Sequence, residues 1–324
     1  MTKAIVLAAP GGPDQFALVE VDTPPPAPGE VQVRQTFSGV NFVDIYHRTG
    51  LYPLPGFPAV LGVDGAGVVE AVGDGVDSLA VGDRVAYAGL PTGGYIEIRN
   101  LPAERVVAIP ATIDDRTAAA AMLRGVTAHM LLKRVHPVVA NRTVLVHAAA
   151  GGLGLILTAW AKRLGARVIG TVGSPAKAEL ALSHGLDHAI LYKETDFVAD
   201  VRALTGGKGV DVAYDGIGAD TLLKTFDAVR PLGMVASIGQ AGGSLPDISL
   251  AELGPSRSLS LSRPSVFAYV NDLASYREAT AALFAEIAAG LDISVGAELP
   301  LAEAARAHLL LENGETSGSI LLVP

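Results

Sequence analysis

The chain has no cysteine among its 324 residues. This absence excludes disulfide bonds, a thiolate nucleophile and any zinc or iron–sulfur site held by cysteine. Aromatic residues are also scarce, at 5% of the chain, although 50% of the residues are hydrophobic. The core must therefore be built mainly from Ala, Val, Leu and Ile, and this composition is typical of an α/β protein.

Positive charge is in short supply. The chain has 24 Lys and Arg against 33 Asp and Glu, which gives a net charge of −9. A surface with this balance repels phosphate backbones, so we expect no nucleic-acid partner.

Long uninterrupted apolar runs are missing as well. The most apolar stretch, residues 143–161, contains His147 and a cluster of glycines. No other segment approaches the ~20 apolar residues that cross a bilayer. The apolar stretch at the N-terminus is too short for a secretory signal. We therefore expect a soluble, cytoplasmic protein without a membrane partner.

Two patterns of secondary structure divide the chain. Residues 1–110 hold short Val- and Ile-rich runs ended by Gly, Pro, Asn or Asp, which predict a compact, barrel-like antiparallel domain. From about Thr117, six predicted strands alternate with helices. This order predicts a doubly wound parallel sheet. One of the predicted helices covers residues 220–231. The tail after Arg263 holds predicted helices and a closing strand, and we expect it to complete the first domain.

The stretch "HAAAGGLG", residues 147–154, lies between a strand-like run and a helix-like run. A dinucleotide-binding turn uses one glycine for the tight turn, one for approach to the pyrophosphate and one for helix packing. Gly151 and Gly154 suit the last two roles, and Gly152 adds another position without a side chain, but Ala149 replaces the first glycine. We predict a modified turn that holds a pyrophosphate at the helix N-terminus. A purely structural turn is the alternative.

The next predicted strand lacks the acidic residue of an NAD site. That acid normally lies ~20 residues beyond the glycines and binds the ribose 2′-hydroxyl. Here the first acid is Glu179, inside the next helix, while Gly173 and Ser174 take its place and Lys177 follows. A hydroxyl, backbone N–H groups and a cation suit a 2′-phosphate, which favours NADPH over NADH. Ser174 is equally typical of a helix N-cap and Lys177 of a solvent-facing helix residue.

Several motifs recur in order along the whole chain: "NFVDIYHRTGLYP" (41–53), "HAAAGGLG" (147–154), "GTVGSPAK" (170–177), "YDGIG" (214–218) and "SRPS" (262–265). With them the chain resembles the NADPH-dependent quinone oxidoreductases, the zeta-crystallin branch of the medium-chain dehydrogenase/reductase superfamily.

The resemblance implies an α/β fold with two domains. Residues 1–123 and 266–324 would form a GroES-like, β-rich catalytic domain, and residues 124–265 a Rossmann domain with a doubly wound, parallel, six-stranded sheet. It also implies a homodimer in which residues 258–262 pair across the twofold axis. The alternative for that strand is a sheet edge covered within the monomer.

The resemblance further implies a zinc-independent enzyme. Zinc-dependent relatives carry a cysteine ligand and a later Gly-His-Glu motif, where this chain has "SGVNF" (38–42) and Gly62-Val63-Asp64. The lobe that binds structural zinc is also absent from the sequence. We expect no metal ligands among the histidines.

Carried over position by position, the resemblance implies a set of NADPH contacts. They are Asn41, Asp44 and Tyr46 beside the nicotinamide; Gly151, Gly152 and Leu153 at the pyrophosphate; Gly173, Ser174, Lys177 and Tyr192 at the 2′-phosphate; Gly239 and Gln240 at the nicotinamide ribose; and Arg263, Pro264 and Ser265 in a segment that closes over the cofactor. Asn41 with Asp44 is also typical of a helix capping box. Tyr192 taken alone is typical of an aromatic at a strand end.

The implied reaction is metal-independent hydride transfer from NADPH to a small-molecule quinone. Such an acceptor delocalises its developing negative charge, so one hydrogen-bond donor would suffice. We predict Tyr46 or Tyr52 for this catalytic role; either could instead form the wall of an apolar pocket. One alternative reaction is reduction of the C=C bond of α,β-unsaturated ketones or aldehydes. An alternative of another class is an NADPH-binding or RNA-binding protein with little catalysis.

Overall fold

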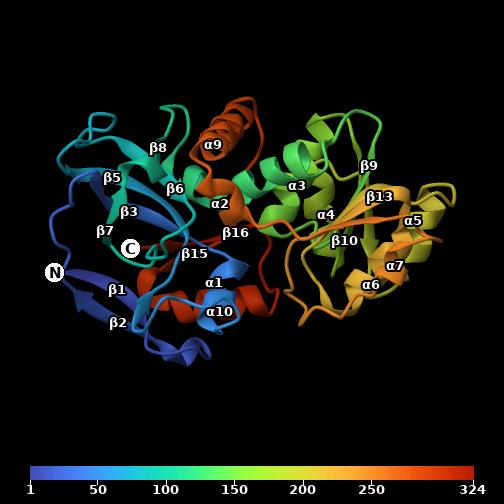
Figure 1. Ribbon diagram of the computed structural model, residues 1–324, viewed down its shortest axis with the longest axis horizontal. Helices are drawn as coiled ribbons and strands as arrows, with labels where there is room; N and C mark the ends of the chain where they lie inside the picture. The colour runs from blue at the N-terminus through green and yellow to red at the C-terminus, as the bar shows by residue number, and fades with distance from the viewer. The chain divides into compact units, whose positions relative to one another are not determined.

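The computed structural model of the protein describes residues 1–324 except for the side chain of residue 220. The chain divides into two compact units, which we call the first unit (Met1–Val126 with Phe267–Pro324) and the second unit (Thr127–Val266). The boundaries expected from sequence are 123/124 and 265/266. Both ends of the chain therefore belong to the first unit, where the blue and red segments of Figure 1 lie together.

The first unit is rich in strands. They are β1 (Thr2–Leu7), β2 (Phe16–Val21), β3 (Glu30–Val40), β4 (Ala59–Val60), β5 (Asp64–Val72), β6 (Arg84–Ala88), β7 (Ile98–Pro102), β8 (Val106–Ala108), β15 (Val295–Pro300) and β16 (Ser319–Val323). One sheet has the order β2-β1-β4 and the other β15-β16-β3-β5-β6-β8, with β7 paired to β3. The named strands of residues 1–110 pair antiparallel, as predicted, whereas the pair β15–β16 of the tail is parallel. The reason is that a helix connects these two strands, as a parallel crossover requires.

The helices of this unit come from both ends of the chain. They are α1 (Phe42–Arg48), α2 (Asp115–His129), which continues past the unit boundary, α8 (Val266–Asn271), α9 (Leu273–Ala288) and α10 (Ala304–Glu312), with 3-10 turns at Pro13–Gln15, Ala103–Arg105 and Leu301–Glu303. Ile320 and Leu322 of β16 lie opposite Val40 and Ser38 of β3. Both pack into one apolar core with side chains of β1. The expected return of the tail to the first part of the chain is confirmed.

The second unit contains one sheet. Its strands are β9 (Thr143–Val146), β10 (Arg167–Val172), β11 (His188–Leu191), β12 (Val210–Asp215), β13 (Val229–Ser237) and β14 (Ser260–Ser262). The order is β11-β10-β9-β12-β13-β14 and every pair is parallel. This confirms the predicted doubly wound sheet. The helix predicted over residues 220–231 was too long, because Val229 already pairs with Val210 as the start of β13.

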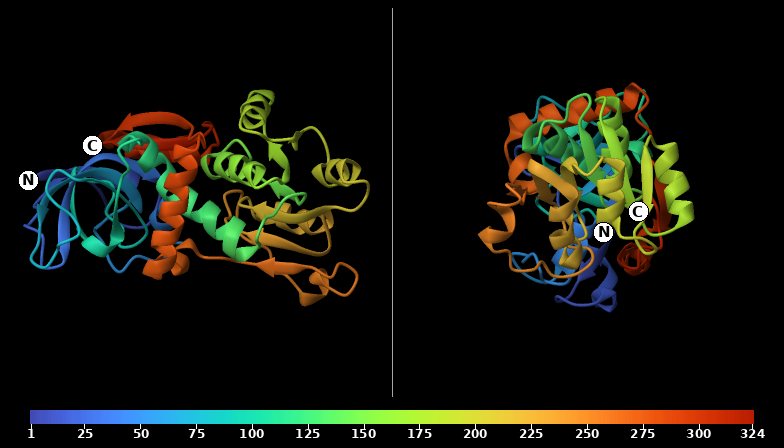
Figure 2. Two further views of the ribbon diagram at one scale, coloured as in Figure 1. Left: turned by 90° about the horizontal axis from the view of Figure 1, so that it is seen from above. Right: turned by 90° about the vertical axis from the view of Figure 1, so that its right-hand side faces the viewer.

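Helices flank this sheet on both faces (Figure 2). They are α3 (Gly152–Arg163), α4 (Pro175–Ser183), α5 (Phe197–Leu204), α6 (Ala219–Ala228) and α7 (Leu250–Leu253), with a π-helical turn at Met130–Val135. Apolar side chains of α5 and α6, among them Phe197 and Phe226, share a core cluster with the strands. Gly165 and Gly185, predicted to end α3 and α4, have φ of +83° and +93°, which only glycine adopts readily. Among the described residues, no helix is both long and apolar enough to span a bilayer.

Candidate functional site

The carboxyl ends of the strands meet at one edge of the second unit, because its sheet is parallel throughout. The strand order reverses between β9 and β12, and ligands of such sheets bind outside this reversal point. The predicted cofactor residues of this unit lie just beyond strand ends: Gly151 after β9, Ser174 after β10, Gly239 after β13 and Arg263 after β14.

The turn after β9 ends at the start of α3. Gly151 is the N-cap of this helix, and Gly152 and Leu153 are its first two residues, so their N–H groups lie in the turn that has no partner inside the helix. The left-handed backbone of the turn falls at Ala148, with φ +50°. A side chain at Gly154 would overlap the Ala148 carbonyl oxygen and come within 2.8 Å of the Cα that follows it. The turn and the helix can therefore approach this closely only with glycine at 154.

A buried polar cluster lies beneath this turn. The two ring nitrogens of His147 are each 2.9 Å from a hydroxyl oxygen, that of Thr171 and that of Thr225. Thr225 also donates to Asp215 Oδ2 at 3.1 Å, and Asp215 Oδ1 accepts the Gly218 N–H. Burial lowers the pKa of His147, against the charge of Asp215, and so favours the neutral ring. The sequence reasoning missed this cluster, although its signal was a polar residue near the end of each of three strands.

A basic corner follows β10 and β11. Ser174 is the N-cap of α4, and its Oγ accepts the Lys177 N–H at 3.4 Å. A side chain at Gly173 would lie 3.6 Å from Lys193 Cε and 3.7 Å from the Tyr192 hydroxyl. Burial, and then the charge of Lys193, lowers the pKa of Lys177. The structure thus brings the four residues predicted for this corner together and adds Lys193, whose position next to Tyr192 was the available signal.

Arg263 gathers the residues at the end of β13. Its Nη1 donates to the Gly239 carbonyl at 3.2 Å, and its Nη2 donates to Gln240 Oε1 at 3.4 Å. Pro264 and Ser265 follow directly, between β14 and α8. The residues predicted for this side of the cofactor are therefore neighbours in space.

In the first unit, Asn41 lies among buried charges. It caps α1 in the capping box expected from sequence, and its backbone N–H donates to Asp44 Oδ2 at 2.8 Å. Its side-chain Nδ2 donates to Asp64 Oδ1, also at 2.8 Å. Burial, with Asp64 nearby, raises the pKa of Asp44 to about 7. Burial also raises the pKa of Asp64, against the opposing charge of Arg124. Sequence reasoning identified neither Asp64 as the partner of Asn41 nor Arg124 as the charge near Asp64.

The two tyrosines proposed as hydrogen-bond donors are in contact. The rings of Tyr46 and Tyr52 have centroids 5.2 Å apart and planes at 61°. The Tyr52 N–H donates to the Tyr46 carbonyl at 3.0 Å, which folds the loop after α1 back on the helix. His47 Nδ1 lies 3.1 Å from the Tyr52 carbonyl oxygen, and burial lowers the pKa of His47. One local fold therefore holds the two tyrosine rings next to each other.

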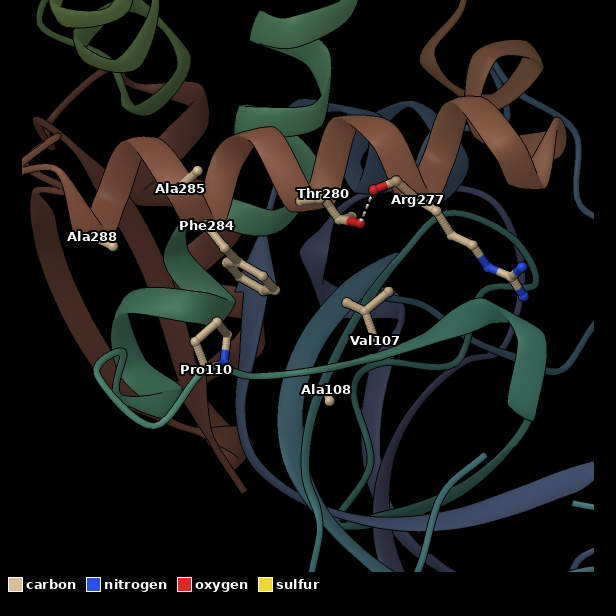
Figure 3. A pocket seen from close by; sticks show the side chains of 9 residues that line it. Val107, Ala108, Pro110, Arg277, Thr280, Phe284, Ala285 and Ala288 are labelled. Atoms are coloured by element: carbon tan, nitrogen blue, oxygen red, sulfur yellow. Dashed lines mark hydrogen bonds between the residues drawn. The ribbon is translucent and has the colours of Figure 1, made fainter. Parts of the chain in front are cut away.

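The first unit also has an apolar groove that contains none of the predicted site residues. It holds about 480 Å³ between β8 and α9 and is lined by Val107, Pro110 and Phe284, among others (Figure 3). Thr280 on its wall donates to the Arg277 carbonyl at 3.1 Å. Among the described side chains, no group of three or more His, Asp or Glu could hold a metal ion.

Comparison with known proteins agrees with both units. Residues 27–111 match the alcohol dehydrogenase GroES-like domain, and residues 152–284 match the family described as zinc-binding dehydrogenase. The chain is 45% identical to a 2-haloacrylate reductase of Burkholderia sp, over 100% of this chain and 99% of the other. Two solved structures cover almost all of it. A Pseudomonas syringae quinone oxidoreductase has a TM-score of 0.97 at 41% identity, covering 100% of both chains. The Escherichia coli quinone oxidoreductase complexed with NADPH has a TM-score of 0.95 at 40% identity, and the match covers 99% of this chain and 100% of the other.

Proposed function

The chain belongs to the quinone oxidoreductases of the medium-chain dehydrogenase/reductase family, and from this premise we propose that it reduces a quinone with NADPH. The observation that carries the choice of cofactor is the basic corner of Ser174, Lys177 and Lys193. The sequence has no acid between Gly154 and Glu179 that would repel a 2′-phosphate.

The residues of the second unit fit a dinucleotide phosphate. The N-terminus of α3 offers backbone N–H groups and a positive helix dipole to the pyrophosphate at Gly151, Gly152 and Leu153. Ser174 uses its Oγ lone pair as the cap of α4, so its hydroxyl hydrogen remains to donate to a phosphate oxygen. Lys177 supplies charge at the same place.

NADPH supplies the hydride when it is bound, and the protein orients the acceptor and excludes water. In this proposal Asn41 and Asp44 border the nicotinamide, and Arg263 holds Gly239 and Gln240 along its ribose. Tyr46 or Tyr52 donates a hydrogen bond to the quinone oxygen on which negative charge develops. Because a quinone spreads that charge over its ring, a single neutral donor is enough.

The proposed enzyme has two domains and assembles as a dimer. Residues 1–123 and 266–324 form the catalytic domain, and residues 124–265 the cofactor domain. The enzyme works without zinc, since the sequence has no cysteine to match the ligands of zinc-dependent relatives. It is a cytoplasmic homodimer, with the edge strand β14 (Ser260–Ser262) at the twofold axis. Analytical ultracentrifugation tests the dimer, and a monomer at micromolar concentration contradicts it.

A second candidate reaction is reduction of a conjugated C=C bond. One observation favours it: the relative that is 45% identical over the whole chain is named for reduction of 2-haloacrylate. A conjugated carbonyl or carboxylate accepts hydride at carbon and, like a quinone, spreads the resulting charge. The same cofactor corner and the same tyrosines serve both reactions.

The test compares NADPH and NADH oxidation with quinones, enones, enals and 2-haloacrylate as acceptors. We expect quinone turnover with NADPH preferred, and about a tenfold loss of kcat/KM for NADPH in Lys177→Ala and in Lys193→Ala, because each removes a charged phosphate contact. Lys208→Ala is the control, since it also removes a lysine charge, at an exposed position before β12 and at the opposite edge of the sheet. Equal efficiency with NADH, unchanged in both corner variants, contradicts the cofactor assignment. If Tyr46→Phe and Tyr52→Phe both retain full turnover, neither hydroxyl group is the proposed donor.

A further inference from the structure

Besides Asp44, Asn41 contacts a second buried residue, Asp64, which is distant from it in the sequence. Asp64 begins β5, and strand pairing of Ser38 with Gly65 brings it next to the end of β3. Its Oδ1 accepts from Asn41 Nδ2 at 2.8 Å. We propose that Asp64 is a positioning residue, which fixes the Asn41 carboxamide for contact with the nicotinamide half of NADPH. This inference rests on the proposed function.

Both oxygens of Asp64 are used, which explains why an acid is needed here. Oδ1 accepts from Asn41, and Oδ2 accepts the Leu123 N–H at 3.2 Å. An asparagine at this position has one acceptor oxygen and one NH₂ group, so one of the two donors would face another donor. The carboxylate also settles which end of the Asn41 amide is nitrogen, because only the NH₂ end donates to it.

The surroundings hold Asp64 and Asn41 in one orientation. Asp64 is fully buried, and Arg124 is buried beside it. Arg124 Nη2 donates to the Val40 carbonyl at 2.6 Å, directly before Asn41. The backbone N–H of Asn41 is meanwhile taken by Asp44. The main chain of this residue is therefore fixed on both sides, and the hydrogen bond to Asp64 sets the direction of its Nδ2.

Gly39 provides the space for this arrangement. A Cβ at residue 39 would overlap Asp64 Oδ1 and lie 2.9 Å from its Cγ. Gly39 itself lies in β3, opposite the C-terminal strand at Leu321. Gly39→Ala therefore displaces the Asp64 carboxylate without removing a charge or a hydrogen-bonding atom. It gives an independent way to perturb the contact.

The test is a double-mutant cycle between Asp64→Asn and Asn41→Ala, read as kcat/KM for NADPH with a quinone in the full-length protein. Misplacing a contact group by a fraction of an ångström to 1 Å costs up to ~100-fold in rate. We expect Asp64→Asn to lower kcat/KM for NADPH about tenfold, mainly through a higher KM for NADPH. When Asn41 is already Ala, the same substitution should lower kcat/KM less than twofold. Gly39→Ala should give the same pattern, and it supplies the cycle if Asp64→Asn does not fold.

Asp115→Asn is the matched control, because it removes a carboxylate that pairs with Arg84 in the same unit. It should lower the melting temperature and leave kcat/KM within twofold. Equal losses from Asp64→Asn in both backgrounds overturn the positioning role but leave the proposed function intact. No loss of NADPH turnover in Asn41→Ala overturns the contact by Asn41, and with it the positioning role. No turnover in the unmodified protein with any acceptor is a failure of the proposed function itself.

Discussion

The ionisation of Asp44 should affect the stability of the fold. The residue is fully buried, and burial with the neighbouring Asp64 raises its pKa from 3.8 to about 7. The native protein therefore binds a proton at Asp44 over a pH range in which the unfolded chain has lost it. Where the native state binds more protons than the unfolded state, stability falls as pH rises. This group therefore lowers stability progressively between about pH 4 and 7. Above pH 7 the penalty is constant.

Asp44→Asn should remove that penalty. The amide oxygen can still accept the Asn41 N–H, and no charge has to be buried. We expect the melting temperature to rise more at pH 8 than at pH 5, as measured by thermal unfolding followed by circular dichroism. Asp77→Asn, at an exposed position, serves as the control and should change neither value. A greater stabilisation at pH 5 than at pH 8 would show that the Asp44 pKa is not raised.

At the scale of elements, the close contact between α3 and the turn before it depends on Gly154. Its replacement by Ala puts a Cβ against the backbone of the turn rather than against a movable side chain. We expect Gly154→Ala to destabilise the protein by roughly 2 kcal/mol, as overpacking does, and to weaken NADPH binding at the displaced turn. Gly206→Ala is a comparison without a steric clash, because a Cβ there meets nothing within 4 Å; any cost comes from its φ of +60°. Denaturant unfolding and NADPH titration measure both effects.

A part-buried ion pair connects α1 to α10. The side chain of Arg48 is 3% exposed and donates to both Glu312 oxygens, at 2.9 and 2.6 Å. Glu312→Ala leaves the guanidinium buried without this partner, and we expect a loss of roughly 2 kcal/mol in denaturant unfolding, less than for a fully buried pair because Glu312 is part-exposed. Glu303→Ala removes the exposed partner of Arg306 and should cost less than about 0.5 kcal/mol. Equal losses of stability in Glu312→Ala and Glu303→Ala would contradict the expected difference between the part-buried and the exposed ion pair.

Sequence reasoning predicted the second unit better than the first for a physical reason. Parallel strands alternate with helices at short spacing, so each element of the second unit carries its own local signal. In the first unit, β15 (Val295–Pro300) was not predicted, since "VGAELP" contains glycine, glutamate and proline rather than β-branched alternation. The start of β13 was hidden because Val229-Arg230-Pro231 continued a helical pattern.

The residues of the candidate site divide in the same way, into those with a local signal in the sequence and those without one. Gly173, Ser174 and Lys177 were found because they are near one another in the sequence and have a shared chemistry. Asp64 could not be linked to Asn41 in this way, since the register between β3 and β5 brings them together. Residues related by strand pairing need the register, which the sequence does not state.

At the scale of the whole molecule, cofactor binding should stabilise the fold by mass action. NADPH at 100 times its Kd adds about 2.7 kcal/mol to the free energy of unfolding, which for a chain of 324 residues corresponds to a rise in melting temperature of roughly 4 °C. Adenosine 2′,5′-bisphosphate should stabilise more than adenosine 5′-monophosphate, because only the former has a 2′-phosphate for the basic corner. The difference should shrink in Lys177→Ala. Equal shifts with both nucleotides in the unmodified protein would contradict a 2′-phosphate site.

The discontinuous first unit has a consequence for biosynthesis. Strand β3 needs β16 as its neighbour, yet about 280 residues (319 − 40) separate the start of β16 from the end of β3. At the ~5–20 residues per second of translation, this edge of β3 waits roughly 14–56 s on the ribosome. The second unit is continuous and has all of its strands before then. A nascent chain therefore passes through a stage in which the cofactor-binding half is complete while the other half still exposes an unpaired strand, the stage at which aggregation or a chaperone would compete for it.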